Sequence, residues 1–216
     1  NNDQTIDTDN AGGGSFDAIK NSLQINEVRS IASYVWIWTA LMTVQWITAI
    51  NIVEDWSQNS EQRLRFFAIM EQVISPLTLI VQLFFTNLII KKIGIKNILL
   101  GYGILFCSAF ILYGLIPSII SVGVVTVFLR VFEYGINKPT RETIFSTFKK
   151  NDRYKSTVFI DTFISRFGDL SGSGFIAIGK LTSIAANSLP LIAIPIAGFL
   201  SMLGIRISRN INTKDL

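Results

Sequence analysis

Hydrophobic residues form six long runs along the chain, and short segments rich in charged residues separate them. Each run spans about 19 to 25 residues, close to the roughly 20 apolar residues that an α-helix needs to cross a bilayer. The pattern therefore predicts an all-α membrane protein with six transmembrane helices, over residues 31–53, 66–90, 98–116, 118–136, 157–179 and 184–204.

Polar residues dominate the two ends of the chain. Residues 1–15 are mildly acidic and end in glycines, so they cannot bury enough apolar surface to fold. We expect a flexible cytoplasmic linker and pre-helix segment over residues 1–28, a six-helix transmembrane bundle over 29–206 and a cytoplasmic tail over 207–216. Because the sequence begins with Asn1 rather than Met, we expect a fragment or a processed product.

Composition supports the membrane interpretation and disfavours catalysis. Half of the 216 residues are hydrophobic and only 16% are charged, whereas a soluble domain is usually nearer a quarter charged. The chain has no histidine, which removes the usual general base and the commonest metal ligand. The single cysteine, Cys107, lies within a hydrophobic run and has no intrachain partner for a disulfide. We therefore expect no enzyme, no metal site and no cofactor.

The positive charges predict how the runs are oriented. Basic residues precede the first run and follow the second, fourth and sixth, and by the positive-inside rule these segments lie in the cytoplasm. Both termini are then cytoplasmic, as an even number of spans requires. The net charge of +4 follows from this topology and does not call for a nucleic-acid partner.

Ionisable residues within the hydrophobic runs are the candidate functional residues, because a charge at bilayer depth is costly unless it faces protein or water. Arg130 and Glu133 are three residues apart, as are Arg166 and Asp169, so each pair is close enough to form an ion pair on one helix. Such pairs are either static links or the lining of a cavity. The full set, including one residue at the outer end of the first run, is Glu54, Glu71, Arg130, Glu133, Asp161, Arg166 and Asp169.

Asp161 stands apart from these pairs, because it has no partner at ideal helical spacing. It is therefore the stronger candidate for a ligand or proton site. Helical periodicity places Asp161 on the same face as Gly168 and Gly172. Two glycines four residues apart let a neighbouring helix approach closely, so we expect them to serve helix packing.

The segment 137–174, NKPTRETIFSTFKKNDRYKSTVFIDTFISRFGDLSGSG, carries a family resemblance. It resembles the ATP/ADP translocases of intracellular bacteria and plastids, a family of the major facilitator group, and most closely their uncharacterised bacterial relatives. INIVEDW at 50–56 and KKIGIKN at 91–97 are similar to further motifs of that family. The matched positions of the loop after the fourth run are Pro139, Arg141, Glu142 and Lys155.

The resemblance implies the C-terminal six-helix half of a twelve-helix bundle in a bacterial inner membrane. Its partners would be the lipid bilayer, an N-terminal six-helix half in the same or a separate chain, and a small-molecule substrate, with nucleotide as one candidate. Transport would proceed by alternating access, with nucleotide antiport as one form. The substrate-binding residues would be Glu54, Arg130, Glu133, Asp161, Arg166 and Asp169, and the cytoplasmic-loop motif would be Pro139, Arg141, Glu142 and Lys155.

Two departures from the family concern the substrate. Asp169 and Ser57 stand where the translocases carry lysines, and a carrier of polyanionic phosphates needs cations. Two alternatives therefore stay open beside nucleotide exchange. One is a proton-coupled carrier of a small organic anion or metabolite, in which Asp161 or Asp169 carries the proton. The other is a membrane module that does not transport.

Overall fold

The computed structural model describes residues 26–146, 156–185 and 188–210, and within these ranges the chain folds into helices with no β-strand. The predicted all-α class is confirmed. Most of the predicted linker 1–28 and the end of the predicted tail 207–216 lie outside the described residues. The first helix begins at Asn26 and the last runs to Asn210, so the helical bundle is slightly longer than predicted.

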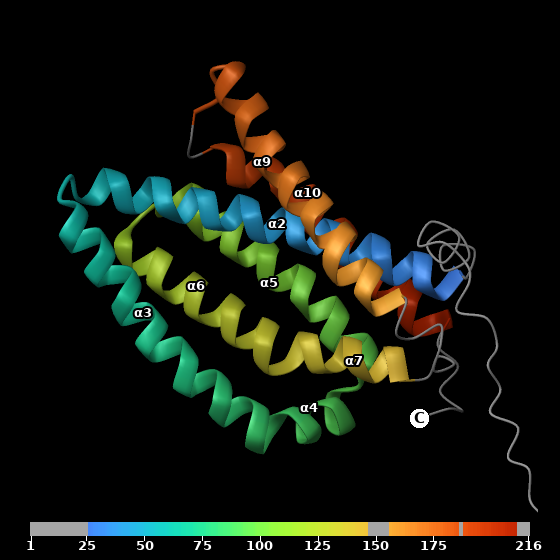
Figure 1. Cartoon of the computed structure of the whole chain (residues 1–216). Helices are drawn as coiled ribbons and strands as arrows, with labels where there is room; N and C mark the ends of the chain where they lie inside the picture. Colours follow the sequence, from blue (N-terminus) through green and yellow to red (C-terminus); the bar gives the residue numbers. More distant parts are fainter. Residues whose placement is uncertain (1–25, 147–155, 186–187, 211–216) are drawn as a thin grey trace, which may run out of the picture.

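We call helical elements that follow one another without a break a rod. Two rods contain a π-helical turn between two α-helical parts, and a third rod has a π-helical turn near its start. Figure 1 shows the rods packed together in one bundle. In chain order the elements are α2 (Asn26–Trp56), α3 (Ser60–Ile80), η1 (Val81–Phe85), α4 (Thr86–Ile93), α5 (Ile95–Leu115), α6 (Ile119–Phe132), η2 (Glu133–Asn137), α7 (Lys138–Ser146), η3 (Ile160–Ile164), α9 (Ser165–Leu181) and α10 (Leu189–Asn210).

Five helices in the described part of the chain are long and apolar enough to cross a membrane: Val28–Trp56, Ser60–Ile93, Ile95–Leu115, Ile119–Ser146 and Leu189–Arg209. The remaining predicted run, 157–179, is helical throughout but does not belong to this set. Its three charged residues and its serines and glycines lower its mean hydropathy. The prediction of transmembrane helices is therefore confirmed in length and composition for five runs, and the sixth span stays a prediction.

Local signals explain several helix boundaries. The Asn59 side chain caps α3 by accepting a hydrogen bond from the Glu61 amide at 2.9 Å. Ser118 caps α6 in the same way, accepting from the Ser121 amide at 3.2 Å. Gly94 separates α4 from α5 at φ 81°, a left-handed conformation that favours glycine.

The fourth run continues beyond its predicted end at residue 136 and stays helical to Ser146, despite Pro139. A proline lacks the amide hydrogen that would bond the carbonyl four residues earlier, here that of Gly135. The Thr86 hydroxyl donates to this carbonyl instead, and the Gln82 amide donates to the Tyr134 carbonyl at 2.9 Å. Side chains from the adjoining η1–α4 rod thus satisfy the backbone groups that the π turn and the proline free.

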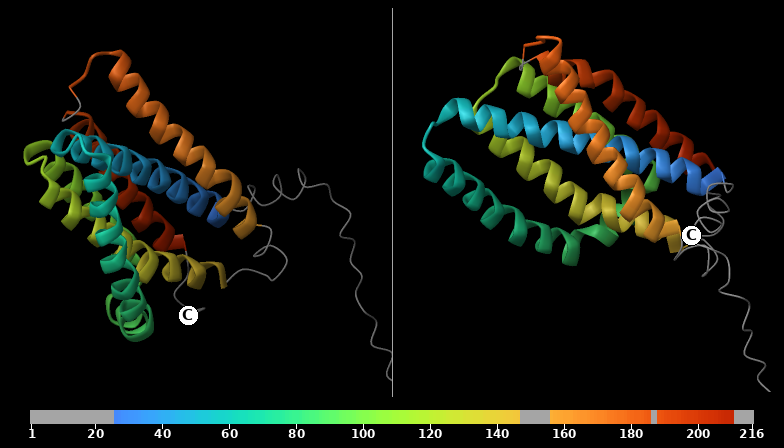
Figure 2. Two further views of the ribbon diagram at one scale, coloured as in Figure 1. Left: turned by 60° about the vertical axis from the view of Figure 1, so that its left-hand side comes forward. Right: turned by 45° about the horizontal axis from the view of Figure 1, so that its top comes forward.

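Helix α2 lies at the centre of the fold. It packs against α9 and α10, α10 packs along α5, and α3 packs against α6, as the views in Figures 1 and 2 show. Glycines permit the closest approaches: a Cβ at Gly103 would lie 2.7 Å from the Ala197 carbonyl oxygen, which places α5 directly on α10. The core between α2, α5 and α10 is filled by large buried side chains, among them Tyr34, Phe106, Phe110 and Leu200.

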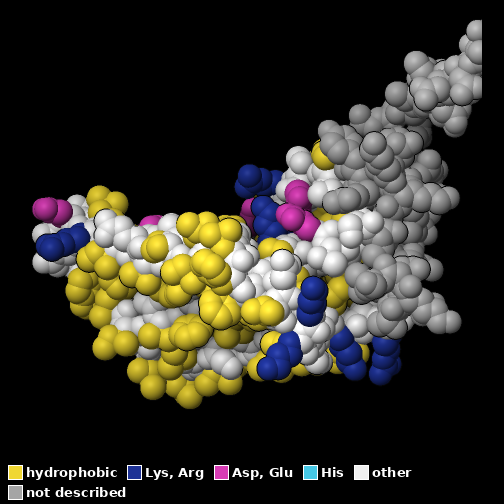
Figure 3. Space-filling view, turned by 90° about the horizontal axis from the view of Figure 1, so that it is seen from below, with side chains coloured by type: hydrophobic (Ala, Val, Ile, Leu, Met, Phe, Trp, Pro, Cys, Tyr) yellow, Lys and Arg dark blue, Asp and Glu magenta, His cyan; other side chains and the backbone are white. Residues whose placement is uncertain are grey.

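Hydrophobic side chains also cover much of the outer surface. On α3 and η1 most large apolar residues are exposed, including Leu64 at 70% and Leu83 at 67%. Figure 3 shows hydrophobic side chains across one face of the molecule, with most of the Lys and Arg side chains at one end and a small charged group at the other. An apolar surface between two charged ends is what a bilayer requires.

The ends of α4, α7 and α10 and the start of α2 lie at the same end of the bundle (Figures 1 and 2). The basic side chains Lys91, Lys92, Lys96 and Lys138 are exposed there. The segments that the sequence assigns to one side of the membrane are therefore close together in space.

Candidate functional site

A cavity of about 270 Å³ lies between α2 and the α6–η2 rod. Arg130 and Tyr134 form its side on α6–η2, one turn apart, with the guanidinium 5.9 Å from the centre of the tyrosine ring. Helix α2 contributes Met42, Thr43, Gln45 and Trp46. The cavity thus has a cation and several hydrogen-bonding groups within helices that are otherwise apolar.

The buried amide of Gln45 anchors the α2 wall of this cavity to the core. Its Nε2 donates to the Tyr113 hydroxyl at 2.9 Å and to the Thr126 hydroxyl at 3.3 Å. A buried amide with these partners fixes the rotation of α2 against α5 and α6.

Arg130 forms a salt bridge with Glu71 of α3, so this ion pair joins α3 to α6 beside the cavity. The arginine side chain is 26% exposed and the glutamate side chain is 49% exposed. The sequence predicted a pair between Arg130 and Glu133 instead, and that prediction is wrong. The Glu133 side chain lies in the interior instead, where Asn137 and Arg141 donate hydrogen bonds to it.

A second set of polar contacts lies on the other side of the cavity, where α2 packs against α9. The Thr43 hydroxyl donates to Asp169 at 2.9 Å, and Arg166 pairs with Asp169 at 3.5 Å. This pair is the one predicted from the three-residue spacing. Because Thr43 also lines the cavity, the polar groups continue from α3 across α6 and α2 to α9. We refer to Glu71, Arg130, Tyr134, Thr43, Asp169 and Arg166 as the polar face.

A separate polar cluster lies largely in the interior of the bundle. Glu133 accepts hydrogen bonds from Asn137 at 2.6 Å and from Arg141 at 3.0 Å, and the two charged side chains are only 3% and 8% exposed. The Trp38 ring covers the Arg141 guanidinium at 4.5 Å, and the Tyr34 hydroxyl donates to Asn137 at 3.4 Å. We refer to Glu133, Asn137, Arg141, Tyr34 and Trp38 as the buried cluster.

The predicted cytoplasmic-loop motif is helical in the described residues. Pro139, Arg141 and Glu142 belong to α7, and Arg141 lies in the buried cluster rather than in a loop. Glu142 is exposed, and Lys155 lies outside the described residues. The helix continues here because side chains of the neighbouring rod replace the hydrogen bonds that Pro139 cannot make.

The structure does not bring Glu54 or Asp161 into contact with the polar face. Glu54 is exposed near the end of α2, and Asp161 is exposed on η3 without an ion-pair partner among the described residues. Asp161 was predicted to share a face with Gly168 and Gly172, but the π turn at Ile160–Ile164 shifts the register between them. Both glycines contact α2, where added Cβ atoms would overlap Thr39 and Ala40.

Sequence reasoning missed three uncharged members of the two groups of residues. Thr43 of the polar face, and Tyr34 and Trp38 of the buried cluster, carry no charge that marks them within a hydrophobic run. A weak signal existed on α2, where Thr39 and Thr43 repeat at helical spacing.

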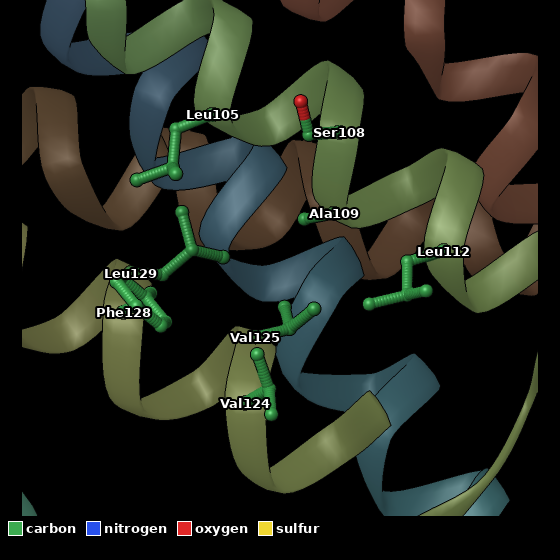
Figure 4. Close-up of a pocket in the computed structure, with 8 residues that line it drawn as sticks. All are labelled: Leu105, Ser108, Ala109, Leu112, Val124, Val125, Phe128 and Leu129. Carbon is green, nitrogen blue, oxygen red and sulfur yellow. The ribbon is translucent and has the colours of Figure 1, made fainter. Parts of the chain in front are cut away.

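A further cavity, of about 140 Å³, lies between α5 and α6 and is almost entirely apolar. In Figure 4 the side chains of both helices extend into the gap between them, and Ser108 is the one polar residue drawn. This cavity offers no charge to a polar substrate. Among the described residues, no group of three acidic, cysteine or histidine side chains could hold a metal ion.

Comparison of the chain with family models, curated proteins and solved structures finds no match.

Proposed function

We propose that the chain is a membrane transporter half of the facilitator type, which moves a small polar solute by alternating access. The observation that carries this proposal is the polar face. Charged side chains from α3, α6 and α9 are partly exposed on helices whose remaining surface is apolar, and they flank a cavity of about 270 Å³. An ion pair that only holds helices together would not need its side chains to be exposed.

The energetics of the bilayer support this interpretation. A charged side chain in contact with hydrocarbon is costly, so side chains such as Arg166, which is 83% exposed, need water, substrate or more protein around them. In facilitators each half of the bundle supplies one side of a midplane site and moves against the other. A second six-helix half, in the same or another chain, would cover the polar face and leave the cavity open to one side at a time.

The paired charges suggest how a solute would be held. Arg130 is paired with Glu71 and Arg166 with Asp169, so each arginine offers an anionic solute group a site only when it leaves its carboxylate. Exchange of an internal partner for a solute group keeps one ion pair at each arginine but leaves the displaced carboxylate without a cation, so that carboxylate must take up water or a proton. The exchange would couple solute binding to a shift of α6 against α3, or of α9 against α2.

One observation favours a proton-coupled carrier over nucleotide exchange. Both arginines of the polar face already have carboxylate partners. The further charge on the α9 rod is that of Asp161 in η3, and it is negative. The polar face therefore contributes no surplus cation for a polyphosphate. A small organic anion taken up together with a proton fits this charge balance better.

The charged ends of the bundle support a proposed orientation. Exposed lysines gather at the end where α2 begins and α10 finishes, so we place both termini in the cytoplasm. Basic residues from several helices agree on this topology, which gives it more support than any single loop would.

Transport assays in proteoliposomes test the function and the choice of solute. The protein as its gene encodes it is reconstituted with internal ADP and external labelled ATP, and then with a pH gradient and labelled small organic anions. ATP uptake that requires internal ADP would identify a nucleotide exchanger. Uptake driven only by the pH gradient would identify a proton-coupled carrier, and no uptake of either class in tight vesicles would overturn both.

A matched pair of variants ties the activity to the polar face. Arg130→Gln removes the cation beside the cavity, whereas Arg65→Gln removes an exposed arginine near the start of α3, away from the cavity. We expect the first to lower uptake at least tenfold and the second to leave it within twofold of the unmodified protein. Equal effects of the two variants would contradict the proposed site.

A further inference from the structure

A second groove lies on a different side of α2, where α9 and α10 flank it. Its volume is about 400 Å³, within the roughly 300–1,000 Å³ range of small-molecule sites. Its lining includes Trp36 and Ala40 of α2, Gly172 and Phe175 of α9, and Ile196 and Phe199 of α10.

The packing of the helices forms this groove. Helices α9 and α10 each pack closely on α2 but make few contacts with each other, and the groove lies between them with α2 as its floor. Gly172 holds α9 against α2 at the Ala40 carbonyl. Helical spacing places Ser171 and Phe175 on one side of this contact and Asp169 on the other, so the groove and the polar face are separate.

The side chains that line the groove offer no free polar group to a ligand. The polar ones are Trp36 and Ser171, and the indole nitrogen donates to the Ser171 hydroxyl at 3.0 Å. That hydroxyl in turn donates to the Phe167 carbonyl at 2.7 Å. Both groups are satisfied within the protein, so an occupant gains nothing from donors, acceptors or charge and must be hydrocarbon.

The position of the groove identifies the source of the hydrocarbon. Its residues lie near the middle of α2 and of α10, two of the helices that are long and apolar enough to cross a bilayer. Its rim is apolar and partly exposed, with Trp36 at 39%, Ile196 at 39% and Phe199 at 49%. From this we infer that the groove binds one acyl chain of a membrane phospholipid, held between α9 and α10 on the surface of α2.

Two tryptophans of nearly equal exposure provide the test. Trp36 lines the groove and is 39% exposed, whereas Trp46 lines the cavity of the polar face and is 38% exposed. Two versions of the full chain are made in which Phe replaces every tryptophan except Trp36 or except Trp46. Each is purified in detergent and titrated with phosphatidylcholine brominated on the acyl chains, because bromine quenches an indole that it touches.

We expect saturable quenching of Trp36 at about one lipid per protein, and at least threefold weaker quenching of Trp46. Linear, non-saturating quenching of Trp36 would mean only general solvation by lipid and would overturn the acyl-chain site. No quenching of Trp36 would overturn the acyl-chain site. If the protein then forms dimers in solution, or a second half-bundle covers the groove, the occupant is protein. Strong quenching of Trp46 would contradict the proposed function instead, since it places the polar face in lipid.

A substitution that fills the groove sharpens the result. Ala40→Leu adds volume on the groove floor, and Ala177→Leu makes the same change at an exposed position of α9 outside the groove. In the Trp36-only protein we expect the first to weaken lipid binding at least fivefold and the second to leave it unchanged. If Ala40→Leu does not fold, Ile196→Trp at the rim of the groove replaces it. This substitution is made in the protein whose only other tryptophan is Trp36, and the retained lipid is measured by native mass spectrometry. Retention of one lipid in both the filled variant and its control would contradict the inference.

Discussion

The Glu133–Arg141 and Arg166–Asp169 ion pairs differ in their surroundings, although the sequence marks both by charges in or beside hydrophobic runs. Glu133 and Arg141 are 3% and 8% exposed and are surrounded by the other residues of the buried cluster. Arg166 and Asp169 are 83% and 45% exposed, 3.5 Å apart, with Thr43 as a neighbour. Charge inside a hydrophobic run thus identifies candidates, but burial separates those that hold the bundle together from those that can meet a solute.

The contrast makes different demands on the two regions. A buried ion pair loses its hydration on folding, and contacts with well-placed partners must offset the lost hydration energy. Removing one member of the pair therefore leaves an uncompensated charge. An exposed pair keeps access to its surroundings and contributes little to stability. We therefore expect substitutions in the buried cluster to affect folding and substitutions on the polar face to affect transport.

The largest effect is expected from breaking the buried pair. Arg141→Met leaves Glu133 without its cation in the interior and should lower the free energy of unfolding by about 3–5 kcal/mol. The double variant Glu133→Gln with Arg141→Met removes both charges and should recover part of that loss. Unfolding of the purified proteins in detergent, followed by circular dichroism, measures the difference. A single variant as stable as the unmodified protein would show that this pair does not hold the helices together.

A medium effect is expected where α9 contacts α2. A Cβ at Gly168 would lie 2.7 Å from the Trp36 carbonyl oxygen, so Gly168→Ala should separate the helices and cost about 1–3 kcal/mol. Gly174 lies on the same helix, and an added Cβ there would meet no atom within 4 Å, which makes Gly174→Ala a matched control without loss of stability. The same detergent unfolding assay compares them. Equal stability of the two variants would rule out close packing at Gly168.

The smallest effect on stability is expected at the exposed pair. Arg166→Gln should change the free energy of unfolding by less than about 1 kcal/mol, because its partner Asp169 keeps the Thr43 hydrogen bond and stays partly exposed. Uptake in proteoliposomes should nevertheless fall at least fivefold, whereas Arg65→Gln should affect neither quantity. A large loss of stability in Arg166→Gln would assign this pair to the fold, alongside the buried cluster.

The fold was predictable where hydrophobic length alone determines the outcome. Five of the six runs are helices long and apolar enough to cross a membrane. A helix is expected for such a run, because its backbone must satisfy its own hydrogen bonds in lipid. The end of the fourth run was not predictable from Pro139, since the Thr86 hydroxyl that replaces its hydrogen bond comes from a distant part of the sequence.

The candidate site was predictable in its residues more than in its contacts. Arg130 lines the cavity and Asp169 accepts a hydrogen bond from Thr43 of the same lining, while their role in a site stays a prediction. The partner of Arg130 was not predicted, because Glu71 lies 59 positions away in the sequence. The π turn at Ile160–Ile164 displaced Asp161 from the face that regular α-helical spacing assigns it. The π turn at Glu133–Asn137 is bonded by Gln82 and Thr86 of the adjoining rod, which a local sequence pattern cannot reveal.

The most direct test of the account is whether the polar face meets water while the opposite face of the same rod meets lipid. The test uses a protein in which Cys107→Ser removes the native thiol. Tyr134→Cys then places a thiol beside the cavity, and Phe128→Cys places one on the far side of α6. The Phe128 side chain is 64% exposed and the Tyr134 side chain 42%. In intact membranes a charged, impermeant thiol reagent needs a hydrated thiolate. We predict rapid labelling of Tyr134→Cys, protected by solute, and slow labelling of Phe128→Cys despite its greater exposure. Equal labelling of both, or faster labelling of Phe128→Cys, would contradict a solute pathway on this face.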